Sequence, residues 1–214
     1  MRTPVQAKSS IRRVVRLLCL ILLPTVSSAG GGPFGIDYRL ERSDTGIWNR
    51  NVQLALGYTV IAVDAGTALW LGNDQPLGHT AWQSADSMAL TGITTTVLKY
   101  AFSRARPTQG NDPNLWFQGS GYESFPSGEV ALQASFVTPF IIDYQREHPW
   151  VWALEILPAY MSVARLKSQA HWQSDVIAGW LIGSGVGYLA TKPRVPIFVQ
   201  VLPRGVTVGL YKHF

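Results

Sequence analysis

The stretch SFPSGEVALQASFVTPFIIDYQRE, residues 124–147, joins a turn to a long apolar segment. A Pro-Ser-Gly turn is followed by mostly apolar residues, which predicts a helix from Gly128 to about Glu147. The free backbone N–H groups at the start of a helix hold anions such as phosphate well. Glu129, an acidic residue in that first turn, therefore stands where an anion would otherwise bind.

Other apolar segments lie on both sides of this helix and are separated by polar or Gly-rich residues. Each is long enough for a helix rather than a strand. Five helices in a chain without internal repeats predict one mainly α domain, built as a helical bundle. The four further predicted helices are Asn51–Leu71, Ala85–Phe102, Trp150 to about Leu166, and Ser174–Ala190.

The last predicted helix carries Gly179, Gly183 and Gly187 at a spacing of four residues, so another helix backbone can approach it closely. Such a stripe also occurs in membrane helices. The uncharged part of this helix is short for a span, which needs about 20 apolar residues. Asp64 and Asp86 interrupt the other candidates. We expect a soluble bundle and keep a membrane-integral bundle as the alternative.

Residues 1–29 have the pattern of a secretory signal peptide, with five basic residues, a short apolar run and small residues for cleavage. Its loss removes five of the 18 Lys and Arg residues, which leaves 13 basic and 13 acidic residues in residues 30–214. A mature chain of zero formal charge does not favour nucleic acid as a partner. We expect an exported protein, in a periplasm, without disulfide bonds because its only cysteine, Cys19, lies in the leader.

The C-terminal residues, about 195–214, alternate apolar and polar side chains around Pro203-Arg204-Gly205. This pattern predicts a β-hairpin. One hairpin does not close a barrel, so we expect it to pack on the domain surface, with peripheral membrane contact left open.

Two basic residues precede a long loop. Lys99 and Arg106 are seven residues apart, which would return both cations to one face of a helix that ends before Pro107. The loop, residues 108–124, is rich in Gly, Asn and aromatic residues, and loops of this length in compact domains are often functional. Its aromatic residues form either a wall for a substrate or a packing contact with the bundle.

A third cluster lies in ARLKSQAHWQSD, residues 164–175. His171 and Asp175 are four residues apart, so the carboxylate is expected to accept from one ring nitrogen and to fix the tautomer of the other. An oriented imidazole is a competent nucleophile. Arg165 carries a planar guanidinium suited to phosphate oxygens.

In order and spacing these three clusters resemble the three-part signature of the type 2 phosphatidic acid phosphatase family, which includes class A acid phosphatases and vanadium haloperoxidases. The signature reads Lys, six residues, Arg-Pro; Pro-Ser-Gly-His; and Ser-Arg, five residues, His, three residues, Asp. Ala164 replaces the serine, and Glu129 stands in place of the first histidine. Residues 99–175 carry the resemblance.

The resemblance implies a helical bundle in which a phosphoryl group is bound without a metal ion. His171 would attack phosphorus, and Asp175 would orient His171 and stabilise its charge. The resulting phosphohistidine would be hydrolysed by water. The implied phosphate-binding residues are Lys99, Arg106, Ser127, Gly128 and Arg165.

Glu129 stands in the position of the histidine that would protonate the leaving group, and its protonation state depends on opposing effects. Glutamate has an intrinsic pKa near 4.3, so cations would keep Glu129 ionised, whereas burial and bound phosphate would favour the protonated acid. Three interpretations follow: an active phosphatase, with Glu129 protonated or with a leaving group that needs less protonation; a weakened or inactive homologue that binds phosphate or phospholipid; and a first-turn acid that only favours the helix.

We favour the active enzyme. It would hydrolyse phosphate monoesters or anhydrides, with a lipid phosphate as the expected substrate, through a phosphohistidine. No cofactor is expected, and vanadate would act only as a phosphate mimic unless the protein is a haloperoxidase. The sequence leaves the oligomeric state and membrane attachment open.

Overall fold

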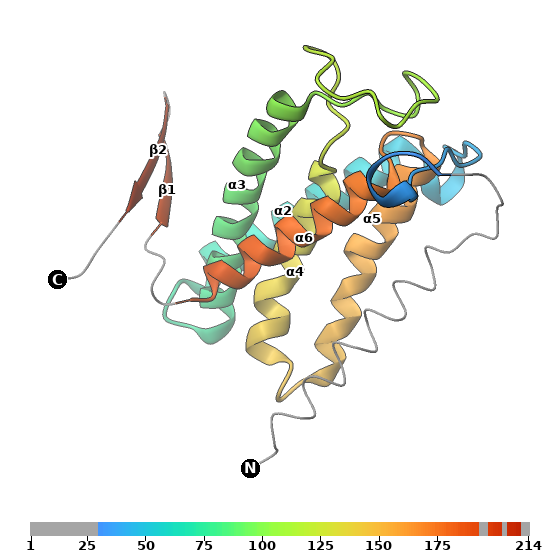
Figure 1. The fold of residues 1–214 in the computed structure, drawn as a ribbon. Coiled ribbons are helices and arrows are strands. Elements are labelled where there is room, and N and C mark those ends of the chain that lie inside the picture. Colours follow the sequence, from blue (N-terminus) through green and yellow to red (C-terminus); the bar gives the residue numbers. More distant parts are fainter. Residues whose placement is uncertain (1–29, 193–196, 203–204, 211–214) are drawn as a thin grey trace.

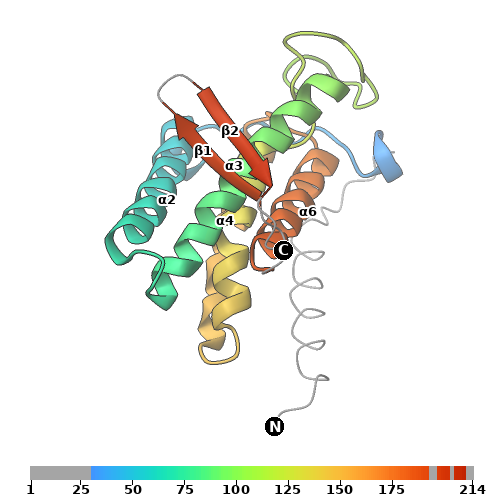
Figure 2. The same ribbon diagram turned by 90° about the vertical axis from the view of Figure 1, so that its left-hand side faces the viewer.

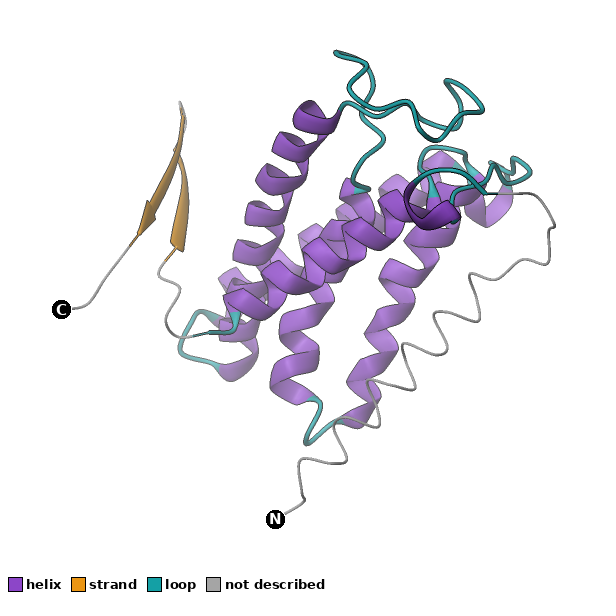
Figure 3. Ribbon diagram, viewed as in Figure 1, coloured by secondary structure: helices purple, strands orange, loops and turns teal. Residues whose placement is uncertain are grey.

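The computed structural model describes residues 30–192 and the backbone of two short C-terminal strands. The predicted leader, residues 1–29, lies outside the described residues. Helices dominate the described chain, as Figures 1 and 3 show, and the predicted mainly α bundle is confirmed. Its long helices are α2 (Arg50–Leu71), α3 (Pro76–Phe102), α4 (Gly128–Tyr144), α5 (Ile156–Lys167) and α6 (Gln173–Ala190), with 3₁₀ helices η1 (Pro33–Gly35), η2 (Gly46–Trp48) and η3 (Pro149–Glu155).

Most predicted helices begin and end within a few residues of the observed bounds, with two differences. α3 begins nine residues before Ala85, at Pro76, where the fixed φ and missing N–H of proline suit the first helical position. The predicted helix from Trp150 is divided into η3 and α5. Both differences lie away from the predicted site residues.

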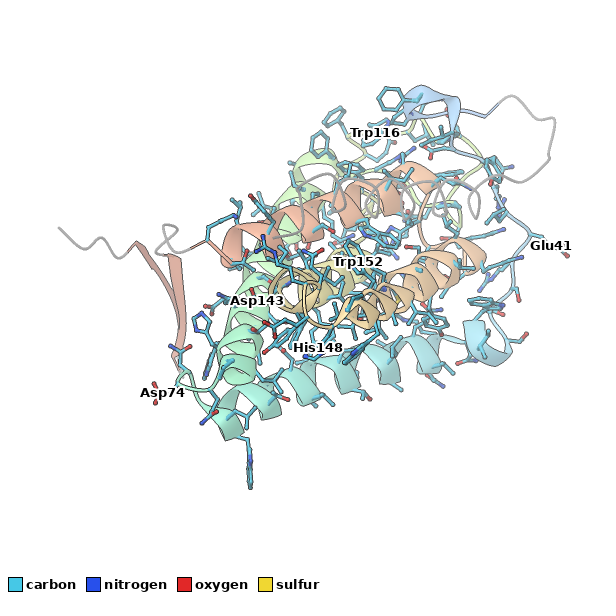
Figure 4. All side chains as sticks on the ribbon, turned by 90° about the horizontal axis from the view of Figure 1, so that it is seen from below. Glu41, Asp74, Trp116, Asp143, His148 and Trp152 are labelled. Atoms are coloured by element: carbon cyan, nitrogen blue, oxygen red, sulfur yellow. The ribbon has the colours of Figure 1, made fainter. Side chains whose placement is uncertain are left out.

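The helix α4 is the centre of the bundle and packs against α3, α5 and α6. Its buried side chains, among them Val130, Val137 and Ile141, join two apolar clusters that α3, α5 and α6 complete. At its far end the Asp143 carboxylate, labelled in Figure 4, accepts a hydrogen bond of 2.6 Å from Thr80 of α3. Contacts near both ends of α4 therefore hold the helix, and with it the turn at its N-terminus, in place.

The glycine stripe of α6 faces α4, and this close approach confirms the sequence prediction. A Cβ atom added at Gly183 would lie 2.1 Å from the carbonyl oxygen of Ala131, and one at Gly179 would lie 2.4 Å from that of Ser127. Distances this short exclude any side chain. The stripe therefore brings α6 directly against the turn that precedes α4.

The helix α2 is the described helix that is long and apolar enough to cross a membrane, by length and composition alone. Its buried residues are few, and large apolar side chains such as Ile61, Leu69 and Trp70 are exposed. Single exposed apolar residues are ordinary, but a face that carries many of them marks an interaction surface.

Two strands, β1 (Ile197–Leu202) and β2 (Gly205–Leu210), pair antiparallel at the C-terminus, with Ile197 opposite Leu210 and Leu202 opposite Gly205. Figure 2 shows them beside each other in the ribbon. Residues 203–204, at the turn, lie outside the described residues. Packing of the predicted hairpin on the domain surface stays a prediction.

Candidate active site

The predicted site residues belong to segments that meet at the loop-rich end of the bundle, and Figure 3 shows the long loops at that end. Lys99 belongs to the last turn of α3, Gly128 is the first residue of α4, and His171 lies two residues before α6. The backbone N–H of Ser127 donates to the carbonyl oxygen of Asp175 at 3.0 Å, which ties the start of α4 to the start of α6. Three segments distant in sequence thus share one location.

His171 is buried, with 4% of its surface exposed. Its Nδ1 lies 2.6 Å from the carbonyl oxygen of Ser124, and because a carbonyl only accepts, Nδ1 carries the proton. The lone pair is therefore on Nε2. Burial lowers the pKa of His171 well below its usual value, and the nearby cations, led by Arg165, lower it further. His171 is a neutral imidazole at neutral pH, and its free lone pair is on Nε2.

Asp175 lies close to His171 but does not hydrogen-bond to it. Its Oδ2 is 3.9 Å from Nδ1 of His171, whereas it accepts from Ser124 Oγ at 2.6 Å and from the Trp172 backbone N–H at 2.8 Å. The expected direct contact fails because His171 precedes α6 while Asp175 lies inside its first turn. Asp175 fixes the Ser124 segment, whose carbonyl oxygen in turn fixes the ring of His171.

Arg104 is a buried residue that the sequence did not single out. It is fully buried, and its guanidinium lies 2.6 Å from Oδ1 of Asp175 and 2.6 Å from Oδ2 of Asp37. Burial raises the pKa of Asp175, while Arg104 and the hydrogen bond from Ser124 lower it. Arg104 therefore provides the charge that a carboxylate at this depth requires.

Lys99 and Arg106 do not lie on one helix, which corrects the sequence prediction. α3 ends at Phe102, and Ser103 adopts a left-handed backbone with φ of 30°. Both cations nevertheless reach the carbonyl oxygen of Glu123, Lys99 Nζ at 2.7 Å and Arg106 Nη2 at 3.4 Å. Burial, with the neighbouring Arg106, lowers the pKa of Lys99 to about 8.

The loop of residues 108–124 contacts the bundle through Trp116. Trp116 packs against Phe102 and Phe125 with ring centroids 6.0 Å and 5.2 Å apart, and the guanidinium carbon of Arg104 lies 4.3 Å from the Trp116 ring. Figure 4 labels Trp116 among these loops. Of the two expectations for the loop, the structure supports packing for Trp116, whereas the Phe117 ring is exposed.

Ser127, Gly128 and Arg165 complete the predicted anion site. A Cβ at Gly128 would lie 3.6 Å from Cε of Lys99, so the lysine side chain lies against the helix start. Within the described chain, Ser127 Oγ and Arg165 Nε are buried and have no hydrogen-bond partner. Unpaired buried polar groups are costly, and an anion beside them would satisfy both.

Glu129 is held by arginines. Nη1 and Nη2 of Arg50 contact its two carboxylate oxygens at 2.8 Å and 2.6 Å, and Nη1 of Arg165 is 3.5 Å away. Burial raises the pKa of Glu129, but the hydrogen bonds from Arg50 and the charges of Arg165, Arg50 and Arg106 outweigh it, so the pKa is lowered. Glu129 is therefore ionised at neutral pH in this arrangement.

An apolar groove of about 170 Å³ is lined mainly by residues of α2 and α4, with Met88 of α3 and Met161 of α5. Glu129 and Gln53 are among its polar lining residues, and Leu54, Tyr58 and Leu132 are among the apolar ones. The groove and the ion pair therefore share Glu129.

Three cations surround His171. Lys99, Arg106 and Arg165 all lower the pKa of His171 through their charge, so each lies near its ring. Cations placed around a transferring phosphoryl group stabilise the charge of its transition state. In the described residues, no group of three or more His, Cys, Asp or Glu is placed to hold a metal ion.

Comparison with known families agrees with this geometry. The family model described as the PAP2 superfamily matches residues 80–195, more than half of the chain. The chain belongs to the PAP2 superfamily. The resemblance seen in the three motifs is confirmed, and the matched region contains every predicted site residue.

Curated relatives match over roughly the same region. A lipid A 1-phosphatase of Porphyromonas gingivalis is 30% identical over 119 residues, covering 55% of this chain and 24% of that protein. An undecaprenyl-diphosphatase of Sulfolobus acidocaldarius is 30% identical over 98 residues, 45% of this chain and 46% of that protein. A lipid A 1-phosphatase of Rhizobium johnstonii is 32% identical over 126 residues, 56% of this chain and 50% of that protein. The chain spans about half or less of the length of these relatives.

Two solved structures also match. The crystal structure of Aquifex aeolicus LpxE has 15% sequence identity and a TM-score of 0.38, and the match covers 71% of this chain and 98% of that one. A transmembrane PAP2 type phosphatidylglycerolphosphate phosphatase from Bacillus subtilis has 17% identity and the same TM-score of 0.38, over 66% and 83% of the two chains.

Proposed function

We propose that this protein is a phosphatase that removes phosphate from a phosphorylated lipid, by way of a phosphohistidine. The observation that carries the proposal is the buried His171, whose Nδ1 proton is held by the Ser124 carbonyl beside three cations. Membership of the PAP2 superfamily and relatives that are lipid A 1-phosphatases and an undecaprenyl-diphosphatase support the reaction class.

The reaction follows from the protonation of the site. The lone pair of His171 Nε2 attacks phosphorus, while Lys99, Arg106 and Arg165 hold the phosphoryl oxygens and offset their charge. The hydrogen bond from Nδ1 to the Ser124 carbonyl stabilises the positive imidazole that forms. Water then attacks the phosphohistidine, releases phosphate and restores the ring.

A lipid substrate is supported by the apolar groove, which Glu129 helps to line, and by the exposed apolar face of α2. The phosphate would bind at Lys99, Arg106 and Arg165, and the hydrocarbon would lie along α2. We further propose association with a membrane surface on the exported side of the cell, in line with the predicted leader.

Release of inorganic phosphate by the purified full-length protein tests this proposal, with phosphatidic acid and a prenyl diphosphate in mixed micelles as substrates. We expect Arg165→Ala to lower kcat/KM by about 10²-fold or more, the range seen when one transition-state donor is removed. Arg146→Ala, an exposed arginine beyond the end of α4, is the matched control and should behave as wild type. Absence of release from both substrates would refute the phosphatase.

A second candidate is a homologue that binds phosphate or phospholipid without turnover. The Arg50–Glu129 ion pair favours it, because Glu129 is no proton donor. This candidate predicts saturable binding of phosphatidic acid vesicles, unchanged in His171→Ala, with no phosphate release. Vanadate, as a phosphate mimic, would compete for the site in either case.

A further inference from the structure

The Arg50–Glu129 contact joins the first residue of α2 to the second residue of α4, 79 residues apart in sequence. The guanidinium and carboxylate meet through two parallel hydrogen bonds of 2.8 Å and 2.6 Å, the geometry in which arginine holds a carboxylate most specifically. Both side chains remain partly exposed, 46% for Arg50 and 30% for Glu129. The pair therefore lies at the open edge of the site.

This pair is connected to the phosphate-binding cations. Glu129 Oε2 is 3.5 Å from Nη1 of Arg165, and the same Nη1 donates to Gln53 Oε1 at 3.1 Å. Gln53 also accepts from Nη1 of Arg50 at 3.5 Å. A change at Arg50 is thus transmitted to Arg165 through two shared acceptors. Without Arg50, the Glu129 carboxylate would bind Arg165 alone and would repel an incoming phosphate.

The leaving group must depart on this side of the site. Attack on phosphorus proceeds in line, with the nucleophile and the leaving oxygen on opposite sides. The nucleophile His171 is 4% exposed, so the rest of a substrate has no room behind it. Glu129 stands where the signature has the histidine that would protonate the leaving group, so the leaving oxygen is expected beside the Arg50–Glu129 pair.

We propose that the Arg50–Glu129 pair determines which leaving groups the site accepts, by presenting a fixed cation and no proton to the departing oxygen. The inference rests on the proposed phosphatase function. A site of this kind suits leaving groups that depart as stable anions, above all the inner phosphate of a lipid diphosphate. Alkoxide leaving groups, which need a proton, are poor substrates for it.

The reaction balances without a proton donor. His171 Nε2 forms a bond to the terminal phosphorus, the bond from that phosphorus to the bridging oxygen breaks, and the oxygen keeps the electron pair as part of a lipid monophosphate. Arg50, whose charge Glu129 already offsets in part, would then donate its remaining N–H groups to the inner phosphate. Water attacks the phosphohistidine, the P–N electron pair returns to Nε2, and both protons of the water leave with the released phosphate.

The test is the dependence of kcat/KM on the leaving group. The full-length protein is assayed with p-nitrophenyl phosphate, phenyl phosphate and an alkyl phosphate, which share a phosphoryl group and differ in leaving-group pKa. We expect a steep fall along the series for wild type. Glu129→His supplies a proton donor, and because such donors are worth about 10²–10⁴ in rate, the ratio of the alkyl phosphate rate to the p-nitrophenyl phosphate rate should rise at least tenfold.

Arg50 variants test the other half of the pair. Arg50→Ala should raise KM and weaken vanadate inhibition by about tenfold, less than for a fully buried donor. The double variant Arg50→Ala/Glu129→Gln should recover most of that loss, because the uncompensated carboxylate is gone. Arg50→Lys, which keeps the charge without the bidentate contact, should lie between, and Arg42→Ala, another exposed arginine paired with a carboxylate, should match wild type.

The outcomes separate this inference from the proposed function. If wild type turns over and Glu129→His shows the same leaving-group dependence, the inference is overturned and the phosphatase function stands. The same holds if Arg50→Ala is indistinguishable from wild type. Absence of turnover in wild type on every ester and on a prenyl diphosphate would overturn both. A melting curve for each variant establishes that the rates compare folded proteins.

Discussion

Arg104 provides the most demanding test of how the site is held together. Its guanidinium is fully buried and forms ion pairs of 2.6 Å with both Asp37 and Asp175. Arg104→Ala removes the cation and leaves two buried carboxylates without compensation. Removing one partner of a buried ion pair costs about 3–5 kcal/mol of folding stability, which is a large part of the roughly 5–15 kcal/mol that holds a typical domain folded.

A matched control is available at the surface. Arg42 pairs with Asp44 at 2.8 Å, but the two side chains are 59% and 47% exposed. Such pairs contribute about 0–1 kcal/mol, so Arg42→Ala should leave stability nearly unchanged. Urea unfolding of the purified proteins at pH 7, monitored by circular dichroism, gives the free energy of unfolding of each variant from the midpoint and slope of the transition.

The pH dependence gives a second readout. Burial already raises the pKa of Asp175, and Arg104 opposes this. In Arg104→Ala the folded-state pKa rises further above the unfolded value, so the folded state binds more protons and its stability falls as pH increases through that interval. The deficit should therefore shrink as pH is lowered from 7 toward 5. If Arg104→Ala lowers the free energy of unfolding at pH 7 by less than about 1 kcal/mol, as expected for Arg42→Ala, Arg104 does not compensate the two buried carboxylates.

Two further predictions concern packing and charge. Gly183→Val should lower stability by about 1–3 kcal/mol or more, measured by thermal melting, because even a Cβ would lie 2.1 Å from the Ala131 carbonyl oxygen; Gly185→Val, where nothing lies near, should have a smaller effect. Phosphate release should decline above about pH 8, as Lys99 loses its proton. Lys99→Arg should move this alkaline limb upward; an unmoved limb would assign it to another group.

Local patterns in the sequence predicted much of the bundle. The apolar segments gave α2, α4 and α6 to within a few residues at either end, because apolar runs bounded by turns and prolines determine helices locally. The glycine stripe of α6 indicated the close approach to α4, since its cause lies within one helix. The three charged motifs share one site, although α3 ends before Arg106 and the two cations converge through the loop backbone.

The contacts that the sequence did not reveal join residues far apart in the chain. Arg104 and Asp37 are 67 residues apart, and Arg50 and Glu129 are 79 apart, with no periodicity that relates one to the other. Arg50 belongs to the polar residues before α2, where a charged residue is ordinary. The ionisation of Glu129 was undecided from sequence because it depends on this arginine.

If His171 carries the phosphoryl group during the reaction, a labelled phosphohistidine can be trapped on the protein. The full-length protein is mixed with a prenyl diphosphate labelled in its terminal phosphate, quenched with alkali within milliseconds, and assayed for bound label. We expect label that survives alkali and is lost in mild acid, as phosphohistidine is, present in His79→Ala and absent in His171→Ala. His79 is an exposed histidine of α3 and serves as the control. If wild type releases phosphate without bound label, or if His171→Ala is labelled equally, His171 does not carry the phosphoryl group.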